Sequence, residues 1–276
     1  MAQIAVTALT REEILNKAPS VFAEKPSTKT SSKYAFIPTT KIIDDLGREG
    51  WVPVSVRESL VRDEKKEGYQ KHMVRFRHPG VTFGPTTLSV GDIIPEIVVT
   101  NSHDALSAFH LNAGIYRLVC SNGLLVAEST INSVSIKHVG YASSDAQEAG
   151  QLLFKELPLL TDKVSSMRGT HLHYEEAAAM AKSAAMLRWP VDATHALPFD
   201  SVELLKSHRR CDDDTNLWNI FNRIQENLLR GGIRYRTASN KKQRTRQVNS
   251  INEDIRLNKA LWALAESMLL LRGIHA

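Results

Sequence analysis

The sequence predicts an α+β protein, with an antiparallel β-sheet-rich N-terminal half followed by a helical C-terminal half. Two patterns along the chain indicate this class. From Trp51 to His78, apolar and polar residues alternate, which is typical of half-buried strands. Beyond Ser143 the apolar residues recur with a period of 3.6, which is typical of amphipathic helices.

This change of pattern divides the chain into three parts. We expect an N-terminal helix and linker over residues 1–33, a β-rich core over 34–142 and a helical part over 143–276. The helical part contains a basic loop at 230–249, and we expect it to form one continuous domain with residues 34–142.

The first elements precede the sheet. Thr10 and Glu13 form a capping box, which predicts a short helix. Residues 24–33 are polar and of low complexity, so we expect a linker or mobile loop. A strand is expected at 34–38, followed by a short amphipathic helix capped by Thr39.

The sheet is predicted to begin with an antiparallel hairpin formed by Trp51–Arg62 and Tyr69–His78. On the first strand Val52, Val54, Val56 and Leu60 share one face. On the second strand Val74 and Phe76 share one face, and we expect both to be buried. The other face is a predicted cationic outer surface, formed by Lys71, Arg75 and Arg77, with the two arginines exposed or paired.

Later strands and helices follow from the same two periods. The remaining strands are expected at Glu96–Asn101, Ala108–Asn112, Ile115–Cys120 and Asn132–His138, with a tight Asn-Gly turn at Ser121–Gly123. The helices are expected at Ser144–Lys163, Tyr174–Leu187, Ser201–Ser207, Leu217–Leu228 and from Ser250 onward. Asp212–Asp214 complements the start of the fourth helix, and Gly231 and Gly232 end it.

Composition and charge limit the possible partners. The chain has 276 residues, of which 42% are hydrophobic, and no apolar run approaches the roughly 20 residues of a membrane span. The chain has two cysteines without metal-ligand spacing, and we see no secretory signal. Both observations favour a cytoplasmic location. A net charge of +5 favours an anionic partner, and we expect no membrane association.

The strongest charge feature lies between the last two helices. From Asn227 through Asn252 there is no acidic residue. The basic residues of this stretch are Arg230, Arg234, Arg236, Lys241, Lys242, Arg244 and Arg246. Such a mobile loop could follow a phosphate backbone, with Tyr235 stacking on a base, and the Lys71, Arg75 and Arg77 strand could supply a second surface. The alternative is a solvated surface loop without a ligand.

A second candidate site is the polar tetrad Asn101, Ser102, His103 and Asp104, together with Asn122. These residues could contact a ligand, or they could form a structural hydrogen-bonded turn. We expect His103 or Asp104 to bond backbone groups near the Ser121–Gly123 turn, because buried polar groups need partners.

No complete catalytic or cofactor motif is present. The sequence lacks HExxH, CxxC, GxSxG and GxxxxGK[ST] patterns. We therefore expect no catalytic residue, no metal and no cofactor, and an enzyme is the third hypothesis.

Several blocks carry a family resemblance. VVTNSHDALSAF, GIYRLVCSNGLLV, LWNIFNRIQENLLRGG and TRQVNSINEDIRLNKALWALAE occur in this order, and the chain from Pro19 onward resembles the YafZ/YfjQ-like proteins of prophages and conjugative plasmids. Ala105 stands where that family has a glycine. The resemblance implies a bacterial cytoplasm, and it carries over no catalytic residue. Because genes of this family accompany antirestriction and DNA-repair genes, it also suggests a role in DNA metabolism or in evasion of host defence.

Two hypotheses follow. The first is a non-enzymatic DNA-binding protein of a mobile genetic element, similar to single-strand annealing proteins, that assembles into homo-oligomers and favours single-stranded DNA. The second is a protein-binding antagonist of a host nuclease or defence complex.

Overall fold

The structure is a computed structural model that describes residues 7–28, 30, 34–61, 63, 66–80, 93–107, 109–117, 123–125, 134–136, 148, 151, 159–191, 196–237 and 239–274. Its contacts divide the chain into two units, Met1–Leu157 and Pro158–Ala276. The first unit carries the sheet and the second consists mainly of helices, which confirms the α+β class.

The first unit is built on an antiparallel sheet with the order β1-β2-β3-β4-β5, in which β6 also pairs with β4. Its strands are β1 (Val52–Glu58), β2 (His72–Arg77), β3 (Ile93–Asn101), β4 (Phe109–Arg117), β5 (Gly123–Leu125) and β6 (Val134–Ile136). The predicted β1–β2 hairpin is confirmed, with Val56 opposite Val74. Two predicted strands are one strand, β4, because its pairing with β3 continues through Ala113 and Gly114. Ser121 and Asn122 of the predicted turn lie outside the described residues.

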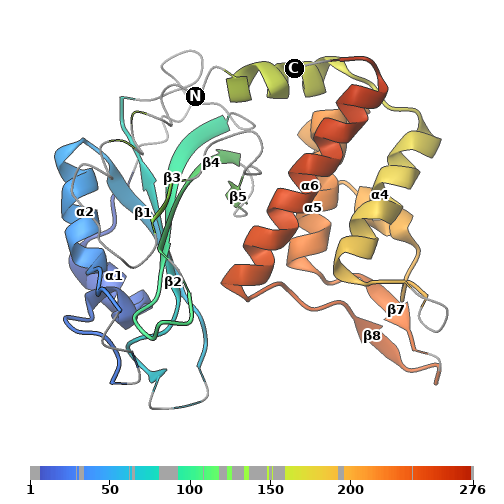
Figure 1. The fold of residues 1–276 in the computed structure, drawn as a ribbon. Helices are drawn as coiled ribbons and strands as arrows, with labels where there is room; N and C mark the ends of the chain where they lie inside the picture. The colour runs from blue at the N-terminus through green and yellow to red at the C-terminus, as the bar shows by residue number, and fades with distance from the viewer. Residues whose placement is uncertain are drawn as a thin grey trace. The chain divides into compact units, whose positions relative to one another are not determined.

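One face of this sheet is covered by the N-terminal helices (Figure 1). These are α1 (Arg11–Lys17), the 3-10 helix η1 (Pro19–Phe22) and α2 (Thr39–Arg48). The capping box of Thr10 and Glu13 is confirmed at the start of α1. Val74 and Phe76 of β2 are fully buried in the core formed with these helices, so the predicted register of β2 is confirmed.

Three local predictions were wrong. Residues 34–38 form no strand. Tyr34 Oη donates to the carbonyl of Ser102, and the Ile37 carbonyl accepts from the side chain of Asn101 and not from a strand backbone. Thr39 is the first residue of α2 and not its cap, and its hydroxyl bonds inside the protein instead. Leu60 is 94% exposed because it lies beyond the end of β1.

The described residues of the second unit form a set of packed helices and a small hairpin. The helices are α4 (Tyr174–Arg188), α5 (Leu217–Arg230) and α6 (Ile251–Leu271), with the 3-10 helices η3 (Ser201–Leu205) and η4 (Arg210–Asp212) and the strands β7 (Arg234–Arg236) and β8 (Lys242–Arg244). Residues 148, 151 and 159–169 are also helical, and the rest of the helix predicted at Ser144–Lys163 lies outside the described residues. Phe221 stacks on Trp218 and meets Trp262 edge-on, which joins α5 to α6.

The ends of α5 and α6 differ in part from the predictions. Asn216 caps α5 by accepting from the Asn219 amide, so the Asp212–Asp214 run does not cap this helix. Ser250 caps α6 as expected. Gly231 ends α5 with a φ of 69°, a conformation that favours glycine.

Candidate nucleic-acid interface

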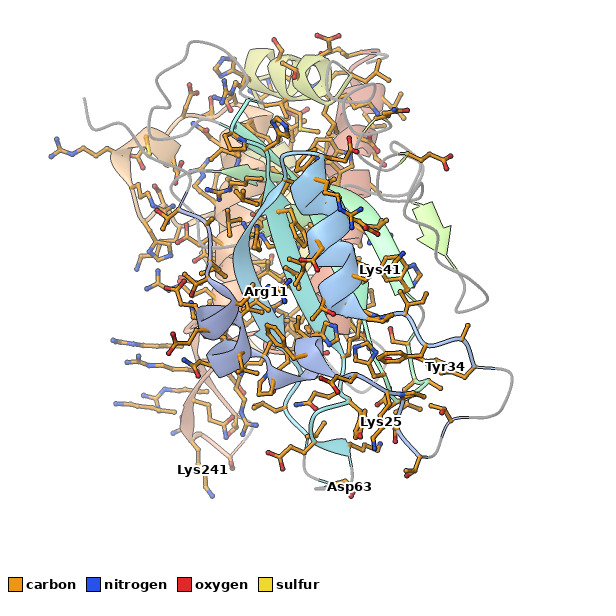
Figure 2. The ribbon with its side chains drawn as sticks, turned by 90° about the vertical axis from the view of Figure 1, so that its left-hand side faces the viewer. Arg11, Lys25, Tyr34, Lys41, Asp63 and Lys241 are labelled. Carbon is orange, nitrogen blue, oxygen red and sulfur yellow. The ribbon has the colours of Figure 1, made fainter. Side chains whose placement is uncertain are left out.

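The basic segment that we expected as a mobile loop forms an antiparallel β-hairpin, so that prediction was wrong. β7 and β8 pair as Arg234↔Arg244, Tyr235↔Gln243 and Arg236↔Lys242. The connecting turn is held by the Asn240 amide, which donates to the Thr237 carbonyl, and by Asn240 in a left-handed conformation with a φ of 60°. Lys241 lies at the tip of this hairpin (Figure 2). Each side chain of the two strands therefore points to a defined face of the hairpin.

Four cations share one face of the hairpin. Direct cross-strand partners point to the same side, as do residues two apart on one strand. Arg234, Arg236, Lys242 and Arg244 consequently form a quartet in which each cation lies opposite another cation. Like charges placed directly opposite each other destabilise a sheet, so the quartet opposes the folding of the hairpin that carries it.

The charge of this quartet is not neutralised within the described part of the chain. All four residues are exposed, and none of them forms an ion pair with a carboxylate in the regions that the structure describes. Arg236 instead donates to the Asn240 side chain, 2.8 Å away. Lys241 and Arg246 are exposed near the quartet, whereas Arg230 lies 3.6 Å from Glu226 on α5. A solvent-facing cluster of this kind attracts anions.

Tyr235 lies on the opposite face of the hairpin from the quartet. Its hydroxyl donates to Gln243 Oε1 over 2.8 Å, and its ring is half-buried. Two open depressions meet at this hairpin. Among the described residues, the first, of about 700 Å³, is lined by the six strand residues, and the second, of about 710 Å³, reaches from Tyr235 to η3. Arg234, Tyr235, Arg236 and Arg244 line both.

The base of the hairpin is attached firmly to the helices. The guanidinium of Arg188, at the end of α4, donates to the carbonyl oxygens of Leu228 and Arg246, the second over 2.5 Å. Burial lowers the pKa of Arg188, and the charge of Glu253 opposes this shift. Gly231 packs so closely that a Cβ there would lie 2.5 Å from the Arg246 carbonyl oxygen. The hairpin thus extends from a fixed support.

The second predicted basic surface, on β2, is not an open cationic face. Arg75 is 6% exposed and forms two hydrogen bonds to Glu96 on β3, of 2.5 and 2.8 Å. Arg77 bonds the same carboxylate over 2.6 Å. Burial of Lys71 lowers its pKa, so its charged form is also partly desolvated. The arginines are paired, as we expected, but the cationic outer surface was wrong, because Glu96 on the neighbouring strand neutralises it.

Three residues of the polar tetrad, Asn101, Ser102 and His103, belong to a buried hydrogen-bonded cluster. Asn101 Nδ2 donates to the Ile37 carbonyl and to Thr39 Oγ1, both over 3.0 Å. The same Thr39 hydroxyl lies 2.7 Å from His72 Nε2 and 3.4 Å from His103 Nε2. Asn101, Ser102 and His103 are fully buried, and the contacts of Asn101 and His103 with Thr39 tie the sheet to α2. Ser121 and Asn122, near which we expected backbone partners for His103 or Asp104, lie outside the described residues.

Two further residues, His72 and Ser20, complete this cluster. His72 is fully buried, and its Nδ1 lies 3.0 Å from Ser20 Oγ. Its pKa is lowered to about 3, mainly by burial and also by the neighbouring His103. Asp104 accepts from the Leu106 amide, and Ala105 has a φ of 61° in the left-handed region that favours glycine. His72 could not be found from sequence, because it stands alone on a strand without a motif.

The described residues offer no metal site and no spanning helix. Within the described ranges, no three His, Cys, Asp or Glu side chains come together to hold a metal ion. No helix in the same ranges is long and apolar enough to cross a membrane.

Comparisons with known proteins identify the family. Residues 28–262 match the family described as "Domain of unknown function (DUF932)". The chain is 35% identical over 261 residues to the UPF0380 proteins YfjQ and YafZ of Escherichia coli (strain K12), and each alignment covers 95% of this chain and 92% of the relative. No solved structure matches the chain. The chain therefore belongs to the DUF932 family and is a relative of the UPF0380 proteins YfjQ and YafZ.

Proposed function

We propose that the chain is a non-enzymatic protein that binds single-stranded DNA through the β7–β8 hairpin. The observation that carries this proposal is the quartet of Arg234, Arg236, Lys242 and Arg244. Two like-charged cross-strand pairs oppose the hairpin in the free protein, and a polyanion removes this repulsion. Each neutralised phosphate also releases condensed counterions, which favours binding at low salt.

A single strand fits this surface better than a duplex. Tyr235 lies beside the second depression, where an unstacked base has access to its ring. Bases in a duplex are stacked and paired, so they cannot reach such a ring without being extruded. The proposal places the protein in the bacterial cytoplasm, acting on DNA of a mobile element, with self-assembly on the strand as its expected mode.

Titration of the purified protein against labelled oligonucleotides tests the proposal. Single-stranded and double-stranded oligonucleotides of one sequence are compared by fluorescence anisotropy at 50 and 200 mM salt. We expect tighter binding of the single strand and a marked loss of affinity at the higher salt, because the contacts are to phosphate. No binding of either form at 50 mM salt would remove the proposal and favour a protein-binding antagonist of host defence.

A further inference from the structure

The second depression has two chemically different walls, and both belong to the unit 158–276. One wall is the cationic hairpin, with Arg234, Arg236 and Arg244. The other wall comes from η3 and the residues that flank it, with Asp200, Glu203, Lys206 and His208. The depression is about 710 Å³ in volume, which is ample for a nucleobase.

The aromatic residues of this depression suit a planar ligand. Tyr235 lines it from the hairpin, and Phe199 lines it from the segment before η3. Phe199 is itself held edge-on by Trp189, with the ring centroids 5.0 Å apart. Aromatic side chains that are fixed in this way stack on bases without regard to sequence.

Most polar groups of the depression are already bonded to the protein. Asn227 Nδ2 donates to the carbonyls of Leu204 and Lys206, and its Oδ1 lies 2.8 Å from His208 Nε2. Asp200 Oδ1 accepts from the Val202 amide as the cap of η3. The Glu203 carboxylate has no hydrogen-bond or ion-pair partner among the described residues, and it is exposed to the depression. Glu203 is thus the carboxylate of this wall for which both oxygens remain to accept from a ligand.

The two walls orient a DNA strand. Phosphates are attracted to the arginines of the hairpin, whereas on the η3 wall the carboxylates of Asp200 and Glu203 outnumber the ammonium of Lys206. The backbone therefore follows the hairpin and the base points toward η3. A carboxylate accepts hydrogen bonds and donates none, so it favours a base that presents an amine, as Asp and Glu do with N4 of cytosine. A base that has a carbonyl oxygen in place of this amine presents a partial negative charge, which the carboxylate repels.

We infer that the depression between η3 and the hairpin is a nucleobase site that selects bases carrying an exocyclic amine, with Glu203 as the selecting residue. The inference rests on the proposed function, because the base is held there by a strand whose phosphates lie on the quartet. It adds a base preference that the phosphate contacts alone cannot produce.

The test compares 15-nucleotide deoxycytidine and deoxyuridine homopolymers at pH 8. Cytosine and uracil differ at position 4, where cytosine has an amine and uracil has an oxygen, and in the proton on N3. The variants are Glu203→Gln and, as a matched control, Glu175→Gln, which removes one exposed carboxylate on α4 outside the depression. Thermal melting verifies that both variants are folded.

We expect the parent and Glu175→Gln to bind the deoxycytidine strand about 5- to 100-fold more tightly than the deoxyuridine strand. Glu203→Gln should reduce this ratio to about 2-fold or less, because the amide no longer discriminates between an amine and an oxygen. Its affinity for the deoxyuridine strand should be unchanged or higher, and the salt dependence of its binding should be unchanged. Equal affinities in the parent, or an unchanged ratio in Glu203→Gln, overturn the base site and leave the proposed function intact. Binding of neither strand at low salt overturns both.

Discussion

Arg234 and Arg244 lie directly opposite each other in the β7–β8 hairpin, as do Arg236 and Lys242 one pair further on. The regular cross-strand pairs of this hairpin place cations opposite cations and Tyr235 opposite Gln243. The side chains of the hairpin therefore add little to its stability. Its order depends on its base, where Thr245 bonds the Ile233 and Gly232 backbone and Arg188 bonds Arg246. The cationic face is therefore held in place by the helices, which keeps it available to a polyanion.

We expect alanine to have different effects on stability at the two glycines at the base of the hairpin. Gly231→Ala should destabilise the protein more than Gly232→Ala. Both have a positive φ, which costs about 1–2 kcal/mol for alanine. Only at Gly231 would the new Cβ meet backbone, 2.5 Å from the Arg246 oxygen, while the Cβ at Gly232 meets nothing within 4 Å. Urea unfolding of both variants measures the difference, and equal losses would show that the close packing at Gly231 is unimportant.

Tyr235 tests the stacking contact separately from charge. Tyr235→Ala should weaken binding of single-stranded DNA by about 1–3 kcal/mol, with the salt dependence nearly unchanged. Tyr235→Phe is the matched control, since it keeps the ring and loses only the hydrogen bond to Gln243. Anisotropy titrations of the three proteins give the result. If the phenylalanine variant loses as much affinity as the alanine variant, the ring does not stack on a base.

The buried ion pair on the sheet predicts a large loss of stability. Glu96→Gln removes the charge that neutralises Arg75, which is buried, and Arg77. Breaking a buried pair by removing one partner costs about 3–5 kcal/mol, because a desolvated charge is left behind. Urea unfolding should show a loss of this size for the first unit. A loss below about 1 kcal/mol would mean that Arg75 finds water or another anion.

The pH dependence of stability should reveal His72. In the folded protein its pKa is about 3, against 6.5 in the unfolded chain, so the unfolded state binds the proton more readily. The free energy of unfolding is therefore unaffected by His72 above about pH 6.5, and it falls as the pH falls from 6.5 toward 3. The slope is about 1.4 kcal/mol per pH unit for one proton. His72→Gln should remove this slope in urea unfolding at pH 7, 6 and 5, whereas an identical slope would place the titration elsewhere.

The sequence predicted the elements that depend on local pattern and missed the contacts that depend on long-range pairing. The alternation of Val74 and Phe76 and the glycine after α5 specified a strand register and a helix end correctly. The same alternation could not reveal that Glu96, about twenty positions away, neutralises Arg75. Nor could it place His72 beside His103, whose rings lie 5.1 Å apart because β2 and β3 pair.

The basic segment shows a similar limit. Its charge was plain in the sequence, but its conformation was not, because Arg and Lys have no strong strand preference and the turn at Asn240 follows no standard dipeptide signal. Glu203 and Phe199 were missed as well, because they carry no motif and join the hairpin only through the fold of η3 onto α5.

The most direct test of the central claim is the salt dependence of single-stranded DNA binding after the quartet is removed. The test variant replaces Arg234, Arg236, Lys242 and Arg244 by glutamine, and the control variant replaces four exposed cations outside the hairpin, Lys17, Lys25, Lys182 and Arg210. Both lose the same formal charge. The test variant should melt no lower than the parent, because its like-charge pairs are gone.

If the quartet binds phosphate, the slope of log affinity against log salt should become shallower by about 2–3 in the test variant, because each lost single-strand contact contributes about 0.7. The control variant should keep the parent slope within about 0.5. Equal slopes in the parent and the test variant, measured by anisotropy between 50 and 300 mM salt, would contradict the assignment of the hairpin as the DNA contact.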